Sequence, residues 1–292
     1  MNTLGFVAEP VLIKRRTSGT LLDFHITLNA FYTFILRVAA PDGSHAWYLD
    51  AARDNGYLDV LNPDFMVEQA RLVHSNGSGE WVDLKALPKS RVSEMVQARF
   101  SPDGVLTGSV QIRAFNEDSY AVKSHYDDFD SEDAYLDDIE ADEQIEITRF
   151  EIKKDYAPLT ELEYDFEKDG EAGDRLYVHP FLSPFHSASS FRKETREIPV
   201  DFPYPTDISY NFVLTVPEGY AVEELPESKS FTCAPVKGRI LFQCREVGNQ
   251  INVIYRFTMD EVLVLPTEYA DLRLFWETAV GLEKSIIVLK KQ

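Results

Sequence analysis

The feature that most constrains the fold of this chain is a two-residue alternation of apolar and polar side chains. It is clearest around residue 100, where apolar side chains fall on one side before and after a short turn, at Val96, Ala98, Phe100, Leu106, Val110 and Ile112. Successive side chains of a strand point to opposite faces of a sheet, so this pattern buries one face and leaves the other in water. The alternation predicts antiparallel strands and a mainly β chain.

Turn residues separate the predicted strands. Pro-Asp-Gly occurs at residues 41–43, between two apolar runs within residues 30–52, and again at residues 102–104. Proline presets the backbone angle of a turn and glycine tolerates positive φ, so each triplet predicts a hairpin. Further strands are expected at 145–152, 160–167, 174–179, 208–216, 239–244 and 250–258. Strands at this spacing are typical of a β-sandwich.

Two helical segments interrupt the strands. Near the end of the chain, residues 266–284 open with Pro266 and place apolar side chains three and four residues apart, at Tyr269, Leu272, Phe275, Trp276 and Ala279. Earlier, an acidic insertion at about 116–142 has two candidate helix caps, Asn116 and Ser131. The predicted fold class is therefore α+β, mainly β, with an antiparallel β-sandwich and two or three helices.

The balance of charge excludes several partners. The chain has 29 Lys and Arg residues against 49 Asp and Glu residues, and its formal net charge is -20. Binding to a phosphate backbone or an anionic membrane surface needs concentrated positive charge, so we expect no nucleic-acid partner. No apolar run is long enough to cross a bilayer, so we expect no membrane insertion. In residues 1–16 the basic residues follow the apolar stretch, which is the reverse of a secretory signal.

The acidic run from Asp127 to Glu146 can be tested as a calcium site. An EF-hand loop that begins at Asp128 needs glycine at its sixth position and a bidentate glutamate at its twelfth. The chain has Asp133 and Ile139 at those positions, so the EF-hand pattern fails. A solvated acidic helix face is favoured, and a looser calcium site is left open.

Other metal and cofactor motifs are missing from the sequence. The six histidines form no pair with zinc-ligand spacing, and neither a glycine-rich phosphate loop nor a G-x-S-x-G elbow occurs. We therefore predict no metal and no cofactor. His179, at the end of a predicted strand, is the strongest single histidine candidate for a chemical role, although a structural role is the simpler interpretation.

The two cysteines, Cys233 and Cys244, lie on either side of a predicted hairpin turn. Strands that fold back can bring two sulfurs together, but the geometry of a disulfide is demanding. Two separate thiols, packed as small apolar residues, are therefore the favoured interpretation.

Three stretches of the chain resemble one family, the large exported bacterial proteins with a transglutaminase-like core flanked by domains of unknown function. The stretches are GFVAEPVLIKRRTSG; AFYTFILRV with HAWYLDAA; and FRKETREIPVDFPYP with VPEGYAVEELPES, EYADLRLFW and IIVLKK. The resemblance covers most of the chain, in the same order. It implies an exported or periplasmic setting. It also implies two domains, with residues 1–65 as a remnant of the transglutaminase-like core and residues 66–292 as a C-terminal β-sandwich.

The resemblance can be checked against the chemistry of such cores, in which an aspartate orients a histidine beside a cysteine thiolate. Asp50 stands at the family's aspartate position, and Thr33 stands where the histidine is expected. Threonine cannot act as a general base at neutral pH. The nucleophile is expected on a helix before residue 5, and neither Cys233 nor Cys244 is placed to substitute for it. We therefore predict no catalytic residues, with Asp50 a vestigial or strand-end carboxylate.

Two functional hypotheses follow. The first is a non-catalytic binding or scaffolding module for a protein, peptide or glycan, with aromatic loops at residues 179–191 and 201–207 either contacting the ligand or anchoring themselves to the sheet. The second is a fragment of a cysteine transamidase or peptidase whose Cys-bearing helix lies outside this chain. A weaker hypothesis is a purely structural role for the acidic surface.

Overall fold

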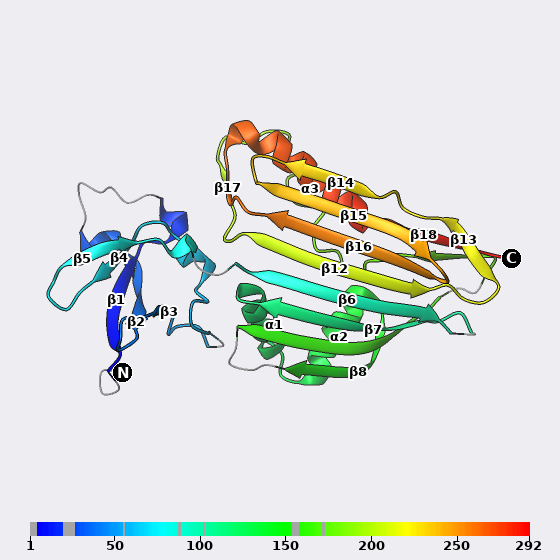
Figure 1. The fold of residues 1–292 in the computed structure, drawn as a ribbon, viewed down its shortest axis with the longest axis horizontal. Helices are drawn as coiled ribbons and strands as arrows, with labels where there is room; N and C mark the ends of the chain where they lie inside the picture. Colours follow the sequence, from blue (N-terminus) through cyan, green and yellow to red (C-terminus); the bar gives the residue numbers. More distant parts are fainter. Residues whose placement is uncertain are drawn as a thin grey trace.

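The computed structural model of the chain describes residues 5–19, 27–54, 56–86, 89–101, 103–153, 158–170 and 173–292. A small N-terminal sheet and a large C-terminal sheet dominate it (Figure 1). The small sheet has the antiparallel order β3-β2-β1-β4-β5. Its strands are β1 (Val7–Ile13), β2 (Thr33–Ala39), β3 (Ala46–Leu49), β4 (Ala70–Val73) and β5 (Gly79–Val82).

The turn between β2 and β3 forms at the first Pro-Asp-Gly triplet. Gly43 has a φ of 69° and donates its backbone N–H to the carbonyl of Ala40 at 2.9 Å. The Asp42 carboxylate accepts the N–H of Ser44 at 3.0 Å, which closes the loop from the other side. The structure therefore confirms the hairpin predicted within residues 30–52. Pro102, in the second triplet, lies outside the described residues, but Gly104 there has a φ of 87°.

The small sheet extends past residue 65. β4 pairs with β1, with Val11 opposite Leu72, and β5 pairs with β4. Val11 and Leu72 are both fully buried in the core of this sheet. Residues 70–82 therefore belong to the N-terminal sheet, which ends later along the chain than the boundary inferred from the resemblance.

The large sheet has eight strands in the order β14-β15-β16-β12-β6-β7-β9-β8. Each strand predicted at 145–152, 160–167, 208–216, 239–244 and 250–258 is present. The bounds are β6 (Arg91–Phe100), β7 (Leu106–Phe115), β8 (Glu146–Lys153), β9 (Leu159–Lys168), β12 (Thr206–Thr215), β14 (Lys229–Cys233), β15 (Gly238–Val247) and β16 (Gln250–Met259).

One pair in the large sheet differs from the antiparallel expectation. β12 and β6 run parallel over eight residues, from Ile208 opposite Val92 to Thr215 opposite Arg99. Parallel neighbours need a long connection, which here includes two helices and four strands between β7 and β12. No local sequence pattern signals this pairing, because it depends on how that connection returns to the sheet.

Three helices and a separate three-stranded sheet form a second layer over one face of the large sheet (Figure 1). The helices are α1 (Glu117–Asp127), α2 (Glu132–Glu143) and α3 (Tyr269–Glu283). The three-stranded sheet contains β10 (Arg175–Val178), β18 (Ile287–Lys291) and β13 (Tyr220–Glu224). β11 (Val200–Asp201) and β17 (Leu263–Val264) form a separate pair. Short 3-10 helices lie at η2 (Arg16–Ser18), η3 (Leu28–Ala30), η4 (Pro63–Phe65), η5 (Leu84–Ala86) and η6 (Pro266–Glu268). The predicted α+β, mainly β class is confirmed.

The alternating residues of the strands supply the main core. Tyr210, Phe212, Tyr255 and Phe257 are each at most 1% exposed, and their side chains share the face that the helices cover. Large apolar side chains of this kind stabilise by about 1.5–3 kcal/mol each when buried. The opposite face of the sheet is left to solvent.

The N-terminus of α1 differs from the predicted cap. The side chain of Asn116 makes no capping bond; its Nδ2 donates to the carbonyl of Lys89 at 2.6 Å. The N–H of Asp118 instead donates to Ser90 Oγ at 2.7 Å. A residue 28 positions away in sequence therefore supplies the acceptor, which a local motif cannot reveal. The second predicted cap, Ser131 of α2, does accept the N–H of Ala134 at 3.2 Å.

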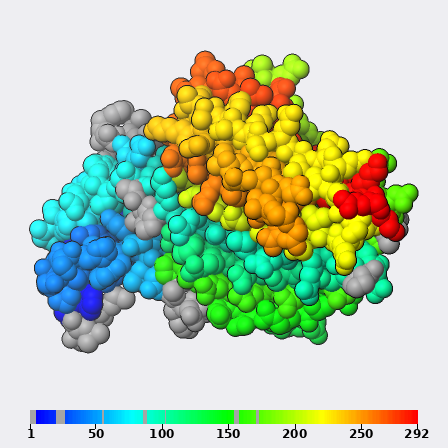
Figure 2. Space-filling model, turned by 45° about the vertical axis from the view of Figure 1, so that its right-hand side comes forward, coloured from blue at the N-terminus to red at the C-terminus, as the bar shows by residue number. Residues whose placement is uncertain are grey.

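A buried arginine joins the N-terminal sheet to the second layer. Arg53, just after β3, donates through both terminal nitrogens to the Glu117 carboxylate at 2.7 and 2.8 Å, and its side chain is 6% exposed. Its guanidinium carbon lies 3.2 Å from the centre of the Tyr120 ring. Bidentate and stacked contacts fix an arginine firmly. Figure 2 shows the resulting arrangement, with the N-terminal sheet at one end and the C-terminal strand at the other.

Candidate binding face

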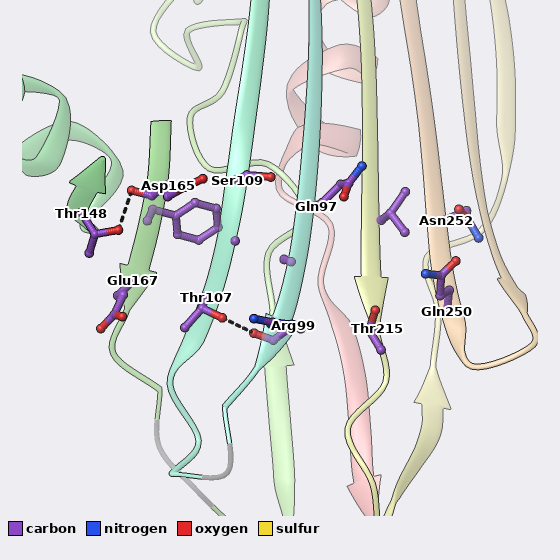
Figure 3. A pocket seen from close by; sticks show the side chains of 14 residues that line it. Gln97, Arg99, Thr107, Ser109, Thr148, Asp165, Glu167, Thr215, Gln250 and Asn252 are labelled. Atoms are coloured by element: carbon purple, nitrogen blue, oxygen red, sulfur yellow. Dashed lines mark hydrogen bonds between the residues drawn. The ribbon is translucent and has the colours of Figure 1, made fainter. Parts of the chain in front are cut away.

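The solvent-facing side of the large sheet carries the polar members of the alternating pattern. A groove of about 720 Å³ lies on it and is formed by strands β6, β7, β8, β9, β12 and β16. The polar side chains around it are Gln97, Arg99, Thr107, Ser109, Thr148, Asp165, Glu167, Thr215, Gln250 and Asn252 (Figure 3). This volume is in the range of small-ligand sites.

The groove is lined mainly by neutral amides and hydroxyls. Each such group can both donate and accept hydrogen bonds. Thr107 Oγ1 donates to the carbonyl of Arg99 at 3.4 Å, and Thr148 Oγ1 donates to that of Asp165 at 3.3 Å (Figure 3). Arg149 Nε donates to the Asp165 carboxylate at 2.8 Å, so this acidic charge is already paired, and the other two charged side chains, Arg99 and Glu167, are opposite in sign. The groove therefore favours an uncharged polar ligand over a strongly charged one.

Gly108 allows the strands beneath the groove to approach closely. A Cβ atom at this position would lie 2.7 Å from the Phe166 ring and 2.3 Å from the carbonyl oxygen of Gln97. The ring of Phe166 is 1% exposed and packs in the core, so it cannot move aside cheaply. Glycine is therefore required where the ring crosses β7.

The aromatic loops serve as anchors in the structure. Phe181 stacks on Tyr210 with ring centres 4.7 Å apart, and Phe185 stacks on Tyr255 at 6.3 Å. Phe202 stacks on Trp276 at 6.3 Å. Of the two roles considered for residues 179–191 and 201–207, the contacts of these side chains match loop anchoring.

A buried histidine and glutamate fix the first of these loops. His186 Nδ1 lies 2.6 Å from Glu283 Oε1, and the His186 backbone N–H donates to Glu283 Oε2 at 2.9 Å. Tyr255 donates its hydroxyl proton to Glu283 Oε1 at 2.8 Å. Both side chains of the pair are almost fully buried. Sequence reasoning selected His179 instead, which is exposed after β10.

The sequence does contain one signal for this network. Glu283 lies four residues after Ala279 and therefore continues the buried stripe of α3. A glutamate in an apolar helix stripe requires a polar partner, because an unpaired buried charge is costly. No local sequence pattern indicates that this partner is His186, which lies 97 residues earlier in the chain.

Asp50 and Thr33 lie at the same open end of the β2–β3 hairpin. Asp50 directly follows β3, and Thr33 begins β2 opposite Ile13. The Asp50 side chain is buried, and its Oδ1 accepts the N–H of Ala52 at 3.1 Å, as in an Asx turn. Within the described part of the chain no histidine or cysteine contacts this carboxylate.

The two thiols are free and buried at opposite ends of the β14–β15 hairpin. Cys233 is opposite Gly238, whereas Cys244 pairs with Val253 on the other side of β15. Burial raises the pKa of Cys233 above its usual value and that of Cys244 to about 11. Both are therefore thiols rather than thiolates at neutral pH, and the favoured interpretation of unpaired cysteines is confirmed.

The acidic run extends from the last residue of α1, through α2, to the first residue of β8. Tyr135 is the buried member of α2 and packs edge-on against Tyr126 and Phe150. Among the residues the structure describes, no group of three or more His, Cys, Asp or Glu side chains is arranged to hold a metal ion. In the same residues, no helix has the length and apolar character to cross a membrane.

Comparisons with known proteins find a match to part of the chain. Residues 174–289, from just before β10 into β18, match the family model described as "Domain of Unknown Function with solved-structure structure" (DUF3858). This segment contains both cysteines, His186 and Glu283. No curated protein matches the chain.

A solved structure shares the fold. It is a protein from Parabacteroides distasonis, described as a candidate protease, with a TM-score of 0.55 and 13% sequence identity. The match covers 99% of this chain and 41% of that one. The chain thus spans well under half the length of this relative. At such low identity, the likeness concerns the fold alone.

Proposed function

We propose that this chain is a non-catalytic binding module, derived from a transglutaminase-like protein, that holds a neutral glycan on the polar face of its large sheet. The observation that carries the proposal is the groove of about 720 Å³ lined by amides and hydroxyls. A glycan presents many hydroxyls, each of which donates and accepts. Side-chain amides meet both demands with one group.

The shape and charge of the groove favour a glycan over a peptide. Strands on both sides already pair the backbone within the groove, so a peptide cannot be added there as a further strand. The carboxylate of Asp165 is neutralised by Arg149, and the other two charged side chains, Arg99 and Glu167, are opposite in sign. The groove therefore has little net attraction for a charged chain. A neutral, hydroxyl-rich polymer fits this lining best.

Three features support the non-catalytic and transglutaminase-derived parts of the proposal. Asp50 and Thr33 share one end of a hairpin, as the family's aspartate and histidine positions would, but Thr33 cannot accept a proton. The thiols of Cys233 and Cys244 are protonated and lie in the other sheet. The fold likeness to a protein described as a candidate protease agrees with such an origin.

The groove can be tested with uncharged hexasaccharides. Chitohexaose, cellohexaose and maltohexaose are titrated into the protein by calorimetry, and we expect saturable binding of at least one. Asn252→Ala and Gln97→Ala should each weaken that binding about fivefold, since each removes a hydrogen bond worth roughly 1 kcal/mol.

Thr232→Ala is the matched control, because Thr232 is exposed on edge strand β14 outside the groove. Its affinity should equal that of the unmodified protein. Failure of all three sugars to bind, or equal weakening by all three substitutions, would reject the groove as the site.

A second candidate is a fragment of a cysteine transamidase or peptidase, favoured by the described activity of the structural relative and by the short span of the match. In a longer protein that includes this chain, Asp50→Ala should then lower amine transfer to glutamine by at least about 100-fold. An unchanged rate, or no transfer at all, would remove this candidate.

A further inference from the structure

A second cavity lies at the end of the N-terminal sheet, away from the polar groove. Its volume is about 280 Å³, and it is formed where the chain leaves β1, beside residues 67–69 and η5. Four of its lining residues are cationic, namely Lys14, Arg15, Arg16 and Lys85. One is acidic, Glu68, whose side chain is 72% exposed and lies 3.6 Å from Lys85.

This concentration of positive charge is opposite in sign to the rest of the molecule. The whole chain has 20 more acidic than basic residues. Clustering four cations raises the local positive potential, and Glu68 is the one acidic residue among those that line the cavity. The potential of this cavity therefore attracts anions, in contrast to that of the chain as a whole.

Arg15 has an unusual environment. Its guanidinium carbon lies 3.6 Å from the centre of the Tyr32 ring. Stacking of this kind occupies a face of the guanidinium, while its N–H donors lie in the plane and need acceptors. Within the residues that the structure describes, Arg15 has no carboxylate or carbonyl partner, and its Nε is buried without a hydrogen bond.

Arg16 is only partly satisfied. Its Nη1 is 3.1 Å from Asp201 Oδ1, close enough for attraction between the charges, and its side chain is 13% exposed. Yet neither Nη1 nor Nε makes an aligned hydrogen bond. A buried donor without an acceptor costs about 1–3 kcal/mol, so two adjacent arginines in this state are a marked departure from normal packing.

We propose that this cavity, which we call the Arg15 site, binds a compact oxyanion, that is a carboxylate, phosphate or sulfate group. The planar fork of a guanidinium matches two oxygens of such a group. Arg15 supplies the fork, held in place by Tyr32, and Lys14 and Lys85 add charge around it. The site is independent of the polar groove, which is on the other sheet.

Calorimetric titration with inorganic phosphate, sulfate and succinate tests the Arg15 site, with sodium chloride used to keep the ionic strength constant. We expect saturable binding with one anion per chain. Phosphate and sulfate binding alone would define a tetrahedral oxyanion site, and succinate binding alone would define a carboxylate site. Arg15→Gln should weaken binding by about tenfold or more.

Two variants keep the test decisive. Lys85→Gln changes a partly exposed side chain and should weaken binding without unfolding the protein. Lys237→Gln removes an exposed charge elsewhere and should leave binding unchanged. The proposal is overturned if no anion binds saturably, or if Lys237→Gln weakens binding as much as Arg15→Gln and Lys85→Gln do.

Discussion

Glu283→Ala is expected to lower the free energy of unfolding by about 3–5 kcal/mol. The Glu283 carboxylate accepts hydrogen bonds from the Tyr255 hydroxyl and the backbone N–H of His186, and it contacts the imidazole of His186. Alanine would leave these groups buried without an acceptor and would also create a cavity. Urea denaturation followed by fluorescence measures the change.

Glu277→Ala is the matched control on the same helix. Glu277 is exposed and pairs with Arg273 four residues earlier, an interaction worth at most about 0.5 kcal/mol. A loss in Glu283→Ala no larger than in this control would mean that the buried network does not hold the loop at residues 179–191.

Glu94→Gln is expected to remove much of the pH dependence of stability between about pH 4.3 and pH 8. Glu94 lies on β6, on the same face of the strand as the buried Val96 and Ala98. Its partner on the neighbouring strand β12 is Tyr210. Burial, and then the nearby Glu143 of α2, raise the pKa of Glu94 to about 8. The pKa of Glu143 is itself raised by burial.

The protein loses stability as the pH rises because the pKa of Glu94 is higher in the folded chain than in the unfolded chain. Below the unfolded value of about 4.3 both states carry the proton, so stability from this group is fully present. As the pH rises toward 8, the Glu94 carboxyl group loses its proton in the unfolded chain but keeps it in the folded chain. The free energy of unfolding therefore falls by up to about 1.4 kcal/mol per pH unit. Other groups that face Glu94 and Glu143 are Tyr164, Tyr210 and Lys168.

The measurement is the urea midpoint at pH 5, 7 and 9. Relative to the unmodified protein, Glu94→Gln should gain about 2–4 kcal/mol at pH 9 and little at pH 5. Glu246→Gln, an exposed glutamate near the end of β15, serves as the control and should keep the original pH profile. If both variants show the same profile, Glu94 does not hold its proton in the folded state.

Local patterns predicted most strands and the C-terminal helix because burial imposes a fixed period on each element. Glu94 was detectable in the same way, since it stands in phase with Val96 and Ala98 on the buried side of β6. What the sequence could not show were contacts between distant segments. The Ser90 cap of α1 and the parallel pairing of β6 with β12 both depend on how long connections return.

The candidate sites were harder to predict than the fold. The polar groove is made of ordinary outward-facing residues from six strands, and their type becomes meaningful only when the strand order is known. Three of the four basic residues of the Arg15 site, Lys14, Arg15 and Arg16, are adjacent in sequence, but Lys85 is not. The stacking of Arg15 on Tyr32 also brings together two segments 17 residues apart. By contrast, Asp50 and Thr33 were selected only through the family resemblance, and both lie at one end of a hairpin.

The central claim is that the polar face of the large sheet binds a neutral glycan. The most direct test is a titration of isotope-labelled protein with chitohexaose, cellohexaose and maltohexaose in turn, in which the backbone amide signals are followed by NMR. We expect saturable shifts with at least one sugar, confined to amides of β6, β7, β8, β9, β12 and β16 around the groove, with the sugar recovered intact. Shifts confined to the loops at residues 179–191 and 201–207, or no shifts with any of the three hexasaccharides, would contradict it.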